Sequence, residues 1–360
     1  MKTAPFYKLA PNRVWRTYLG GRNLDAIEGK AAPEDSHFPE DWILSTTLAS
    51  NVGRESIREG ISSVLLQTGE TIPLPRLLDA FPDGILGEEH RKKYGKQTAF
   101  LLKFLDSSTR LHLQCHPTVA FAQKFLNSPS GKSEGYYILG IRPGCEGYIY
   151  LGFQNPPAPE EFRRMIEEQD IAAMLACFEK IPVRPGEAFY VPGGFPHAIG
   201  EGVFMIELME PTDFAVRIEF ERGGCLLPEK ARFMNRGIDF AISMFDFQKR
   251  SAEAIRNNQF VHPLPLPVEG AAERESLFDR RSTNCFRAER IVVHGDAAVR
   301  QKGFRVLIVT QGSGTLEAGG ESCELKQYDR ILIPAASEEI RFRPRHSHTM
   351  EVVAALPPEV

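Results

Sequence analysis

Residues 186–197 read GEAFYVPGGFPH, and this stretch decides the fold. Its fixed positions are Gly186, Pro192, Gly194 and His197, in the form G-x5-P-x-G-x2-H. Background residue frequencies, with nine histidines in 360 residues, give this combination in about one chain in 500. A strand that ends in a Pro-x-Gly turn delivers the histidine of the next strand to the inside of a barrel. We therefore expect two strands joined by this turn, with His197 facing a β-barrel interior.

A second stretch, residues 110–117, supplies polar groups for the same interior and reads RLHLQCHP. Side chains alternate between the two faces of a strand, so every second residue shares a face. One face then carries Leu111, Leu113 and Cys115, and the other carries His112, Gln114 and His116. Three polar side chains on one strand face must lie in polar surroundings.

The same alternation in residues 131–136 places Lys132, Glu134 and Tyr136 on a common face. Glu134 and His197 can then meet the polar face of residues 110–117. Two imidazoles, one carboxylate and one amide oxygen suit a divalent ion with a position left open for water or substrate. We expect one Zn²⁺ per chain, with manganese, iron and cobalt as alternatives. The predicted ligands are Gln114, His116, Glu134 and His197.

The rest of the chain consists mainly of short apolar runs separated by Gly and Pro, which predicts many short strands. Two segments have apolar residues at helical spacing instead, and we expect helices there. The predicted strands include 100–105, 136–141, 147–153, 188–191 and 203–208, and the predicted helices are 159–179 and 228–257.

A proline-rich segment at 257–270 marks the expected domain boundary, because His262 is followed by three Pro residues within five positions. We predict a metal-bearing domain at 1–226 with a helical insertion around 159–179. A helical connector at 227–262 leads to a second β domain at 263–360.

The second β domain repeats the frame of the first motif at residues 328–339, but without its ligand. Ala336 replaces the turn glycine and Glu339 replaces the histidine. His346 and His348 have a spacing found in metal sites, yet they lie in a basic stretch and are weak candidates. We expect one metal site, in the first domain.

Composition excludes several classes of protein. With 43 Lys and Arg against 47 Asp and Glu, the net charge is -4, and no long run of like charges suits a nucleic acid or a membrane surface. The chain lacks a signal-peptide core and an apolar run long enough to span a membrane, so we expect a cytoplasmic protein. Its six cysteines form no C-x-x-C pair, and this spacing predicts that they are reduced, buried thiols.

At this point the sequence resembles a known family. Residues 186–197 match the second cupin motif, and the chain from about Arg13 to Arg222 resembles class I (type I) mannose-6-phosphate isomerase, a zinc-dependent cupin enzyme also called phosphomannose isomerase. The matching segments are Arg13 to Trp15 with Gly20-Gly21, Glu40 to Ser45, Leu101 to Asp106, Leu113 to Pro117, Lys132 to Tyr137 and Tyr190 to Gly200.

The resemblance implies a mainly β fold of two cupin-type barrels, of the double-stranded β-helix or jelly-roll kind, with helical insertions between them. It implies the same four zinc ligands that strand alternation brings together. It also implies a sugar-phosphate substrate, mannose 6-phosphate interconverting with fructose 6-phosphate through a cis-enediol. We expect a monomer or homodimer.

Three catalytic residues are expected: Arg217, Lys132 and Glu207. Arg217 matches the family's catalytic arginine, and it lies opposite the apolar face of residues 213–220. Glu207 interrupts an apolar run, where an unpaired carboxylate is costly, so Arg217 or a substrate hydroxyl is its expected partner. Glu207, Lys132 and His112 are candidates to move the proton.

Further substrate contacts are expected from His112, Glu40 and Trp42, with ordinary core packing as the alternative role of Trp42. His112 stands where the family usually has a small hydroxyl residue, Gly223 replaces a basic residue, and Arg16 replaces a glycine. These departures leave open a related sugar phosphate or an unphosphorylated sugar. The cation that binds the phosphate is not determined among Arg13, Arg16, Lys103 and Arg222.

Two other functions are compatible with the pattern. A cupin of this kind can bind a sugar or sugar phosphate through its metal without turning it over. An oxygen-using cupin is disfavoured, because Gln114 occupies a position where iron sites commonly have a histidine.

Overall fold

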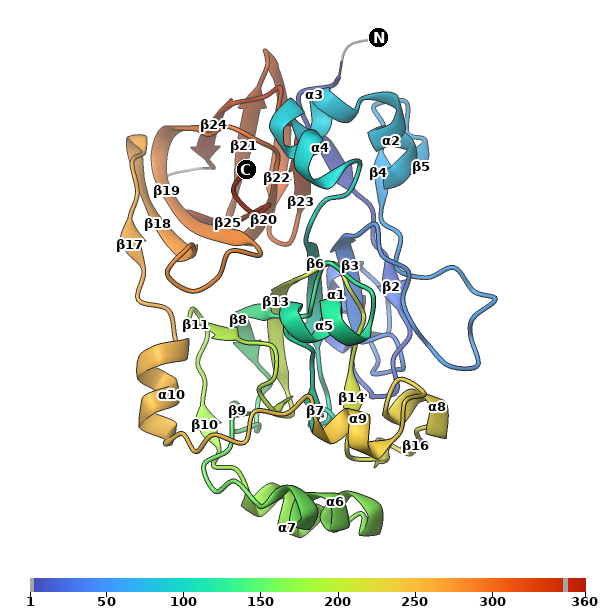
Figure 1. The fold of residues 1–360 in the computed structure, drawn as a ribbon. Coiled ribbons are helices and arrows are strands. Elements are labelled where there is room, and N and C mark those ends of the chain that lie inside the picture. The colour runs from blue at the N-terminus through green and yellow to red at the C-terminus, as the bar shows by residue number, and fades with distance from the viewer. Residues whose placement is uncertain (1–2, 346–348) are drawn as a thin grey trace.

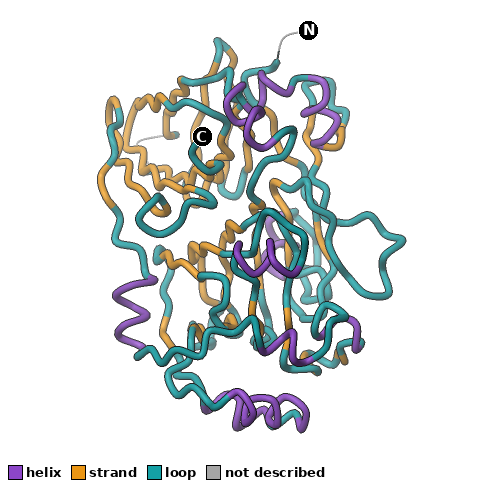
Figure 2. The backbone as a smooth tube through the Cα atoms, viewed as in Figure 1, coloured by secondary structure: helices purple, strands orange, loops and turns teal. Residues whose placement is uncertain are grey.

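The computed structural model describes residues 3–345 and 349–360, so the predicted weak metal pair at His346 and His348 lies outside the described residues. Strands hold 36% of the chain and helices 18%, which confirms a mainly β fold. Figure 1 shows a lower group of strands, flanked by helices, beneath a second group formed largely by the C-terminal third. Figure 2 shows how much of the lower group is loop.

A six-stranded antiparallel sheet forms one side of the lower group, in the order β11-β8-β13-β6-β3-β2. Four of its strands arise from the predicted runs at 100–105, 136–141, 188–191 and 203–208. The strands are β2 (Arg13–Val14), β3 (Glu40–Leu44), β6 (Leu101–Asp106), β8 (Glu134–Ile141), β11 (Ala188–Val191) and β13 (Val203–Met209).

A five-stranded sheet faces it, in the order β10-β9-β12-β7-β14. Apolar side chains from both sheets, such as Met205, Ile138, Leu151 and Ile199, share one buried cluster. The two sheets are therefore the walls of one core. The strands are β7 (Gln114–Cys115), β9 (Tyr148–Leu151), β10 (Ile181–Pro182), β12 (His197–Ile199) and β14 (Val216–Arg217).

The turn in residues 186–197 connects these two sheets, as its motif predicts. Val191 ends β11 in the first sheet, and His197 begins β12 in the second. Gly194 has a φ of 88°, a left-handed conformation that favours glycine. A Cβ on Gly193 would lie 2.6 Å from the carbonyl oxygen of Pro117, so the turn approaches the chain that carries the predicted ligands.

The C-terminal third builds a 12-stranded sheet, and three N-terminal strands extend it. β1 pairs with β23 and with β4, so Tyr7 lies opposite Leu332. The domain boundaries at 226 and 263 remain a prediction. The strands are β1 (Tyr7–Leu9), β4 (Ser63–Leu65), β5 (Thr71–Pro73), β17 (Leu264–Pro265), β18 (Glu269–Phe278), β19 (Arg287–Arg300), β20 (Arg305–Gln311), β21 (Ser313–Ala318), β22 (Glu321–Lys326), β23 (Arg330–Ile333), β24 (Glu339–Pro344) and β25 (Met350–Leu356).

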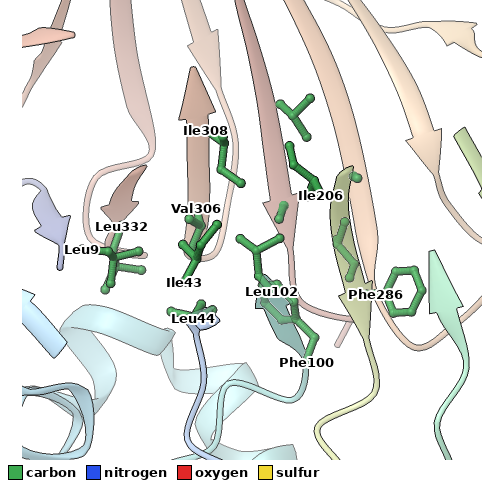
Figure 3. Packing of buried hydrophobic residues seen from close by; sticks show 14 of the residues in the cluster. Leu9, Ile43, Leu44, Phe100, Leu102, Ile206, Phe286, Val306, Ile308 and Leu332 are labelled. Carbon is green, nitrogen blue, oxygen red and sulfur yellow. The ribbon is translucent and has the colours of Figure 1, made fainter. Parts of the chain in front are cut away.

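A large apolar cluster joins the upper and lower groups (Figure 3). Leu102 and Ile206 from the six-stranded sheet pack in it with Val306 and Ile308 from the C-terminal sheet. Burying each such side chain contributes about 1.5–3 kcal/mol. The six-stranded sheet thus has one face on this cluster and the other on the core beside the five-stranded sheet.

The two predicted helical segments are both interrupted. Residues 159–179 form α6 (Pro159–Glu168) and α7 (Ile171–Ala176). A new helix begins after Asp170, because the Asp170 side chain accepts a hydrogen bond from the Ala173 amide and caps the N-terminus of α7. The segment 228–257 is helical as expected, and Gly237, with a φ of 82°, helps divide it into three short helices. These are α8 (Glu229–Arg232), α9 (Ile238–Ile242) and α10 (Ala252–Gln259).

The other elements are short and lie between strands. Among the described residues, no helix combines the length and the apolar character required to cross a bilayer. All six cysteines are free, but only Cys115 and Cys177 are buried; the other four are partly exposed. The remaining elements are α1 (Arg22–Ile27), α2 (Leu74–Ala80), α3 (Pro82–Leu86), α4 (Glu88–Tyr94), α5 (Val119–Phe125), β15 (Glu221–Arg222) and β16 (Cys225–Leu226).

Candidate metal centre and substrate pocket

The four predicted metal ligands lie together between the two facing sheets. Potential ligand atoms of His116, Glu134 and His197 all lie within 4.8 Å of one another. His116 Nε2 is 3.1 Å from Glu134 Oε1, and His197 Nε2 is 3.4 Å from Glu134 Oε2. The Gln114 side-chain amide lies 3.3 Å from His197 Nε2. Strand alternation alone anticipated this convergence.

The protein holds both imidazoles in a form that can bind a metal. His197 Nδ1 donates to the Phe195 carbonyl at 2.9 Å, which leaves Nε2 with its lone pair toward the cluster. Burial, reinforced by the Lys132 ammonium, lowers the pKa of His116 to about 3. A neutral imidazole is the form that coordinates metals.

Glu134 is the central charge of the cluster. Lys132 Nζ lies 2.9 Å from its Oε1, and the Tyr136 hydroxyl donates to its Oε2. Burial alone would raise the pKa of Glu134, but Lys132 and His116 hold it well below its ordinary value. Lys132 Nζ also lies 3.1 Å from His116 Nε2. The ammonium therefore contacts the same atoms that a divalent cation would use, and the donor set fits such a cation.

A narrow pocket with a cavity volume of about 30 Å³ opens beside this cluster. Both facing sheets and the loop at residues 16–18 contribute to its wall. Most of the lining side chains are polar or charged, which suits a hydroxylated or anionic ligand. The lining residues are Arg16, Thr17, Tyr18, Glu40, Lys103, Leu105, Leu111, His112, Gln114, Lys132, Glu134, Tyr136, Glu207, Asp213 and Arg217.

The partner of Glu207 is Lys103, and the expectation of Arg217 is wrong. The two residues lie opposite each other on β13 and β6, with Lys103 Nζ 3.2 Å from Glu207 Oε2. Glu207 Oε1 is buried and has no hydrogen-bond partner among the described residues. Burial raises the pKa of Glu207 to about 8, although Lys103 opposes the shift. Glu207 thus retains a free oxygen at the pocket wall.

Glu40 is the most strongly bound carboxylate of the wall. Its Oε1 accepts from the Tyr18 hydroxyl at 2.6 Å and lies 3.2 Å from Lys103 Nζ. Its Oε2 accepts from Arg16 Nε at 2.9 Å and from Trp42 Nε1 at 2.7 Å. Burial would raise the pKa of Glu40, but Arg16 and Lys103 together hold it well below its ordinary value. Glu40 is therefore an ionised part of the wall.

Trp42 does not line the pocket, contrary to the expectation of a wall residue. Its ring is buried in a small cluster with Val14 and Leu101. The Arg16 guanidinium carbon lies 5.0 Å from the ring centroid, and Arg16 itself lines the pocket. Arg16 is in turn held by Asp213 at 3.1 Å. Trp42 supports the wall through Arg16 and Glu40.

Arg217 is half-buried at the pocket edge, on the face predicted from alternation. It lies directly opposite Gln114 in the β14–β7 pair, and Gln114 lies opposite His197 in the β7–β12 pair. These three side chains therefore form one row across neighbouring strands. Arg217 Nη1 donates a long hydrogen bond, 3.4 Å, to the Ala231 carbonyl.

His112 lines the pocket, but both ring nitrogens are engaged by the protein. Nδ1 lies 2.9 Å from the Glu219 carbonyl, and Nε2 lies 3.2 Å from the Thr17 hydroxyl. Burial, reinforced by Arg217, lowers the pKa of His112 to about 4, so the ring is neutral at pH 7. Leu111 also lines the pocket, because residues 110–113 precede β7 rather than continue its alternation.

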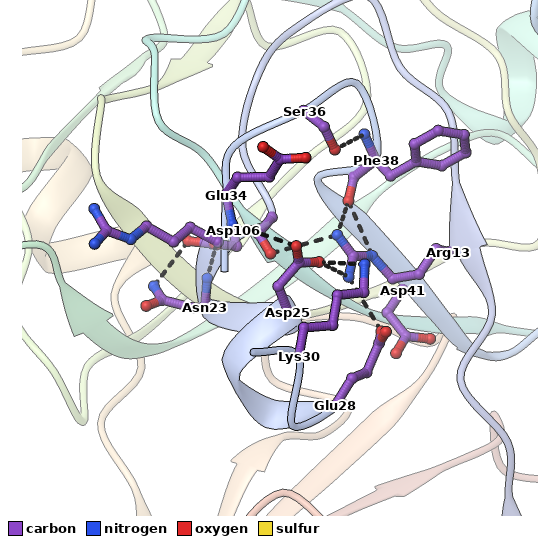
Figure 4. A network of polar contacts seen from close by, with 12 residues as sticks. Arg13, Asn23, Asp25, Glu28, Lys30, Glu34, Ser36, Phe38, Asp41 and Asp106 are labelled. Atoms are coloured by element: carbon purple, nitrogen blue, oxygen red, sulfur yellow. Dashed lines mark hydrogen bonds and ion pairs between the residues drawn. The ribbon is translucent and has the colours of Figure 1, made fainter. Parts of the chain in front are cut away.

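The two other candidate cations point elsewhere. Figure 4 shows Arg13 in a network with Asp25, Glu28 and the Phe38 carbonyl, away from the pocket lining. Arg222 donates to the Arg110 carbonyl at 3.0 Å and does not line the pocket. Arg16 and Lys103, by contrast, both line it.

Five pocket residues escaped the sequence argument: Thr17, Tyr18, Leu105, Leu111 and Asp213. Tyr18 and Thr17 follow directly after a matched motif, so proximity in the sequence was a usable signal. Asp213 begins the alternating stretch that carries Arg217, but only the tertiary structure brings its carboxylate into contact with the Arg16 guanidinium.

Curated relatives cover most of this chain. The mannose-6-phosphate isomerase ManA of Bacillus subtilis is 25% identical over 293 residues, which cover 77% of this chain and 83% of that protein. The mannose-6-phosphate isomerase of Streptococcus mutans is 28% identical over 336 residues, which cover 92% of each chain. No family model matches the chain.

Solved structures share the fold along nearly the whole chain. The mannose 6-phosphate isomerase of Bacillus subtilis superposes with a TM-score of 0.73 at 20% identity, covering 98% of this chain and 99% of that one. The enzyme of Salmonella typhimurium, solved with fructose 6-phosphate and zinc, gives 0.69 at 15% identity, covering 99% and 100%. The fold is therefore that of the solved mannose 6-phosphate isomerases.

Proposed function

We propose that the protein is a metal-dependent mannose-6-phosphate isomerase that interconverts mannose 6-phosphate and fructose 6-phosphate. The observation that carries this proposal is the convergence of Gln114, His116, Glu134 and His197 beside a pocket lined with charged groups. Curated relatives with this activity cover up to 92% of the chain, and solved isomerases share its fold.

These four residues would hold one Zn²⁺. When bound, the metal supplies Lewis acidity that polarises the sugar carbonyl and stabilises the enediolate. The fit rests on two imidazoles, one carboxylate and one side-chain amide that lie close together.

The chain's own residues must move a proton between C2 and C1. Glu207 suits this role best, because its Oε1 is free and its raised pKa, about 8, populates both protonation states near neutral pH. Its carboxylate takes the proton from C2 and returns it to C1, while the hydroxyl proton passes from O2 to O1. His112 is less suited, since both ring nitrogens already have partners.

Two cations lie close enough to assist. Arg217 and Lys132 both line the pocket and can stabilise the negative charge that develops on the enediol oxygens. Glu40 and His112 line the wall and position the sugar, while Trp42 acts through Glu40.

The finer expectations belong to the same proposal. We infer two cupin-type barrels, with the lower one bearing the metal, divided at residues 226 and 263. The cytoplasmic location, and a monomer or homodimer as the assembly, also stay predictions.

Proton exchange at C2 tests the function. Protein loaded with Zn²⁺ is incubated with mannose 6-phosphate in deuterated water, and loss of the C2 proton signal is followed with formation of fructose 6-phosphate. We expect exchange with Zn²⁺ and none after chelation. Glu207→Gln should retain bound zinc and lose exchange. Tight binding of mannose 6-phosphate without exchange would instead indicate a sugar-phosphate-binding cupin.

A further inference from the structure

The segment at residues 131–133 holds Lys132 against the metal-ligand cluster. The Lys132 ammonium lies 2.9 Å from Glu134 Oε1 and 3.1 Å from His116 Nε2, and its side chain is 7% exposed. The segment lies directly before β8 and belongs to no helix or strand. Regular secondary structure therefore does not fix the direction of the Lys132 side chain, and other contacts must do so.

The Glu210 carboxylate binds both ends of this segment. Its Oε1 accepts from the Gly131 amide at 2.9 Å, and its Oε2 accepts from the Ser133 amide at 2.9 Å. The Glu210 amide in turn donates to the Ser133 carbonyl at 3.2 Å. One side chain outside the pocket lining thus binds the residues on either side of Lys132.

Thr212 completes the contact with the segment. Its hydroxyl donates to the Gly131 carbonyl at 2.6 Å, and its amide donates to the Glu210 carbonyl at 2.7 Å. Glu210 is 3% exposed, and a buried carboxylate is costly unless it is hydrogen-bonded. Both partners of this carboxylate are backbone amides of the segment, so its charge is directed at the segment itself. We call Glu210 and Thr212 the clamp.

A segment from the C-terminal third of the chain packs behind the clamp. A Cβ on Gly135, near the start of β8, would lie 2.8 Å from the Phe286 ring and 2.9 Å from the Phe278 ring. Burial, reinforced by the Glu210 charge, raises the pKa of the Cys285 thiol to about 11, so the thiol is neutral beside the carboxylate. The start of β8 therefore has no room to move toward this side.

We propose that Glu210 is a positioning residue of the isomerase, which holds Lys132 at the reacting oxygens through Gly131 and Ser133. This inference rests on the proposed function and on the part of Lys132 in it. Lys132 would stabilise charge that develops only in the transition state, so its placement affects kcat more than KM. β13 carries Glu207 and leads directly into Glu210, so one strand supplies the proposed base and places the cation.

The geometry requires a carboxylate at position 210. Each oxygen faces an amide donor, and Glu210→Gln would turn an NH2 group toward one of them. A buried N–H then lacks its partner, and one end of the segment is released. A misplacement of about 1 Å can lower a rate about 100-fold. Glu210→Gln should therefore lower kcat for mannose 6-phosphate about 10–100-fold, with KM within about threefold and bound Zn²⁺ unchanged.

A double-mutant cycle distinguishes positioning of Lys132 from a general loss of structure. The value of kcat is measured for wild type, Glu210→Gln, Lys132→Met and the double variant. Because Glu210 acts through Lys132, Glu210→Gln should lower kcat less than about twofold in the Lys132→Met background. Equal fold losses in both backgrounds overturn the inference and leave the proposed function intact.

Asp170→Asn is the matched control for the loss of charge. The Asp170 carboxylate also accepts from a backbone amide, that of Ala173, but Asp170 lies outside the pocket lining. Asp170→Asn should retain the wild-type kcat. A loss as large as that of Glu210→Gln would assign the effect to stability and overturn the inference.

A second pair of variants covers the case in which Glu210→Gln does not fold. Thr212→Val removes the hydroxyl that binds the Gly131 carbonyl and keeps the size of the side chain, whereas Thr212→Ser keeps the hydroxyl. The loss of one hydrogen bond should lower kcat about five- to tenfold in Thr212→Val. Thr212→Ser should restore most of it, and the loss should again depend on Lys132. Wild-type kcat in Thr212→Val overturns the inference.

Amine reactivity tests the clamp independently of turnover. Metal-free protein is treated with a trace of acetic anhydride, and acetylation of Lys132 is measured by mass spectrometry, with Lys302, an exposed lysine between β19 and β20, as the internal reference. Glu210→Gln should raise acetylation of Lys132 about tenfold relative to Lys302. A wild type that does not isomerise refutes the proposed function, and this increase then still supports the placement of Lys132 by Glu210. Equal acetylation in both proteins overturns the clamp.

Discussion

Replacing Lys103 by methionine should destabilise the protein through the carboxylates that Lys103 bridges. Lys103 Nζ lies 3.2 Å from Glu40 and from Glu207, and all three side chains are at most 5% exposed. Removing one partner of a buried ion pair costs about 3–5 kcal/mol. We expect about 3 kcal/mol at pH 6.5, because Glu40 keeps Arg16 and Glu207 can remain protonated.

The loss of unfolding free energy caused by Lys103→Met should increase at alkaline pH. Burial raises the pKa of Glu207 to about 8, and Lys103 lowers it against this trend, so Lys103→Met must raise it further. A carboxyl whose folded pKa is raised destabilises the folded state as pH rises toward that pKa. Well below pH 8 Glu207 is mainly protonated in both proteins, and the difference is constant. Above it, the difference grows by up to about 1.4 kcal/mol per pH unit.

Urea unfolding at pH 6.5 and pH 9 measures this effect, with tryptophan fluorescence as the signal and a chelator present throughout. The control Lys302→Met should cost less than about 0.5 kcal/mol. Lys103→Met combined with Glu207→Gln should lose the alkaline increment. A cost below about 1 kcal/mol for Lys103→Met, or an equal cost at both pH values, would refute the reasoning.

Three further predictions concern the metal, the pocket edge and the packing of β8 against the rings of Phe278 and Phe286. His197→Ala should weaken Zn²⁺ binding by more than about 100-fold, because loss of a residue that only supports a metal ligand already weakens metal binding by about 10–100-fold. Metal content after dialysis measures this effect, and unchanged stoichiometry would contradict the ligand assignment. Arg217→Lys should lower kcat about 100-fold, whereas Arg222→Lys, outside the pocket lining, should retain activity. Gly135→Ala should destabilise the fold by about 1–3 kcal/mol in urea unfolding, because its Cβ would meet aromatic rings 2.8–2.9 Å away. Gly140→Ala on the same strand meets no atom within 4 Å and should be nearly neutral.

Much of the site could be predicted because its ligands lie on locally regular segments. Glu134 and His197 lie at the starts of β8 and β12, where alternation and the Pro192–Gly194 turn set their direction. Leu111 did not follow the pattern, since the chain before Gln114 is not a strand. Apolar spacing predicted the helical character of 228–257 but not its division into three helices, which depends in part on the left-handed backbone conformation of Gly237.

The sequence alone determined the mainly β fold, the strand–turn–strand unit at 186–197 and the convergence of four side chains that are predicted to bind a metal. These depend on short-range rules, since alternation and turn geometry act over a few residues. Tertiary structure decided the partner of Glu207, the place of Asp213 on Arg16, and the entry of β1 into the C-terminal sheet. Such contacts join residues that are between 104 (Lys103 and Glu207) and 325 (Tyr7 and Leu332) positions apart, and they depend on how whole sheets pack, which no local pattern encodes.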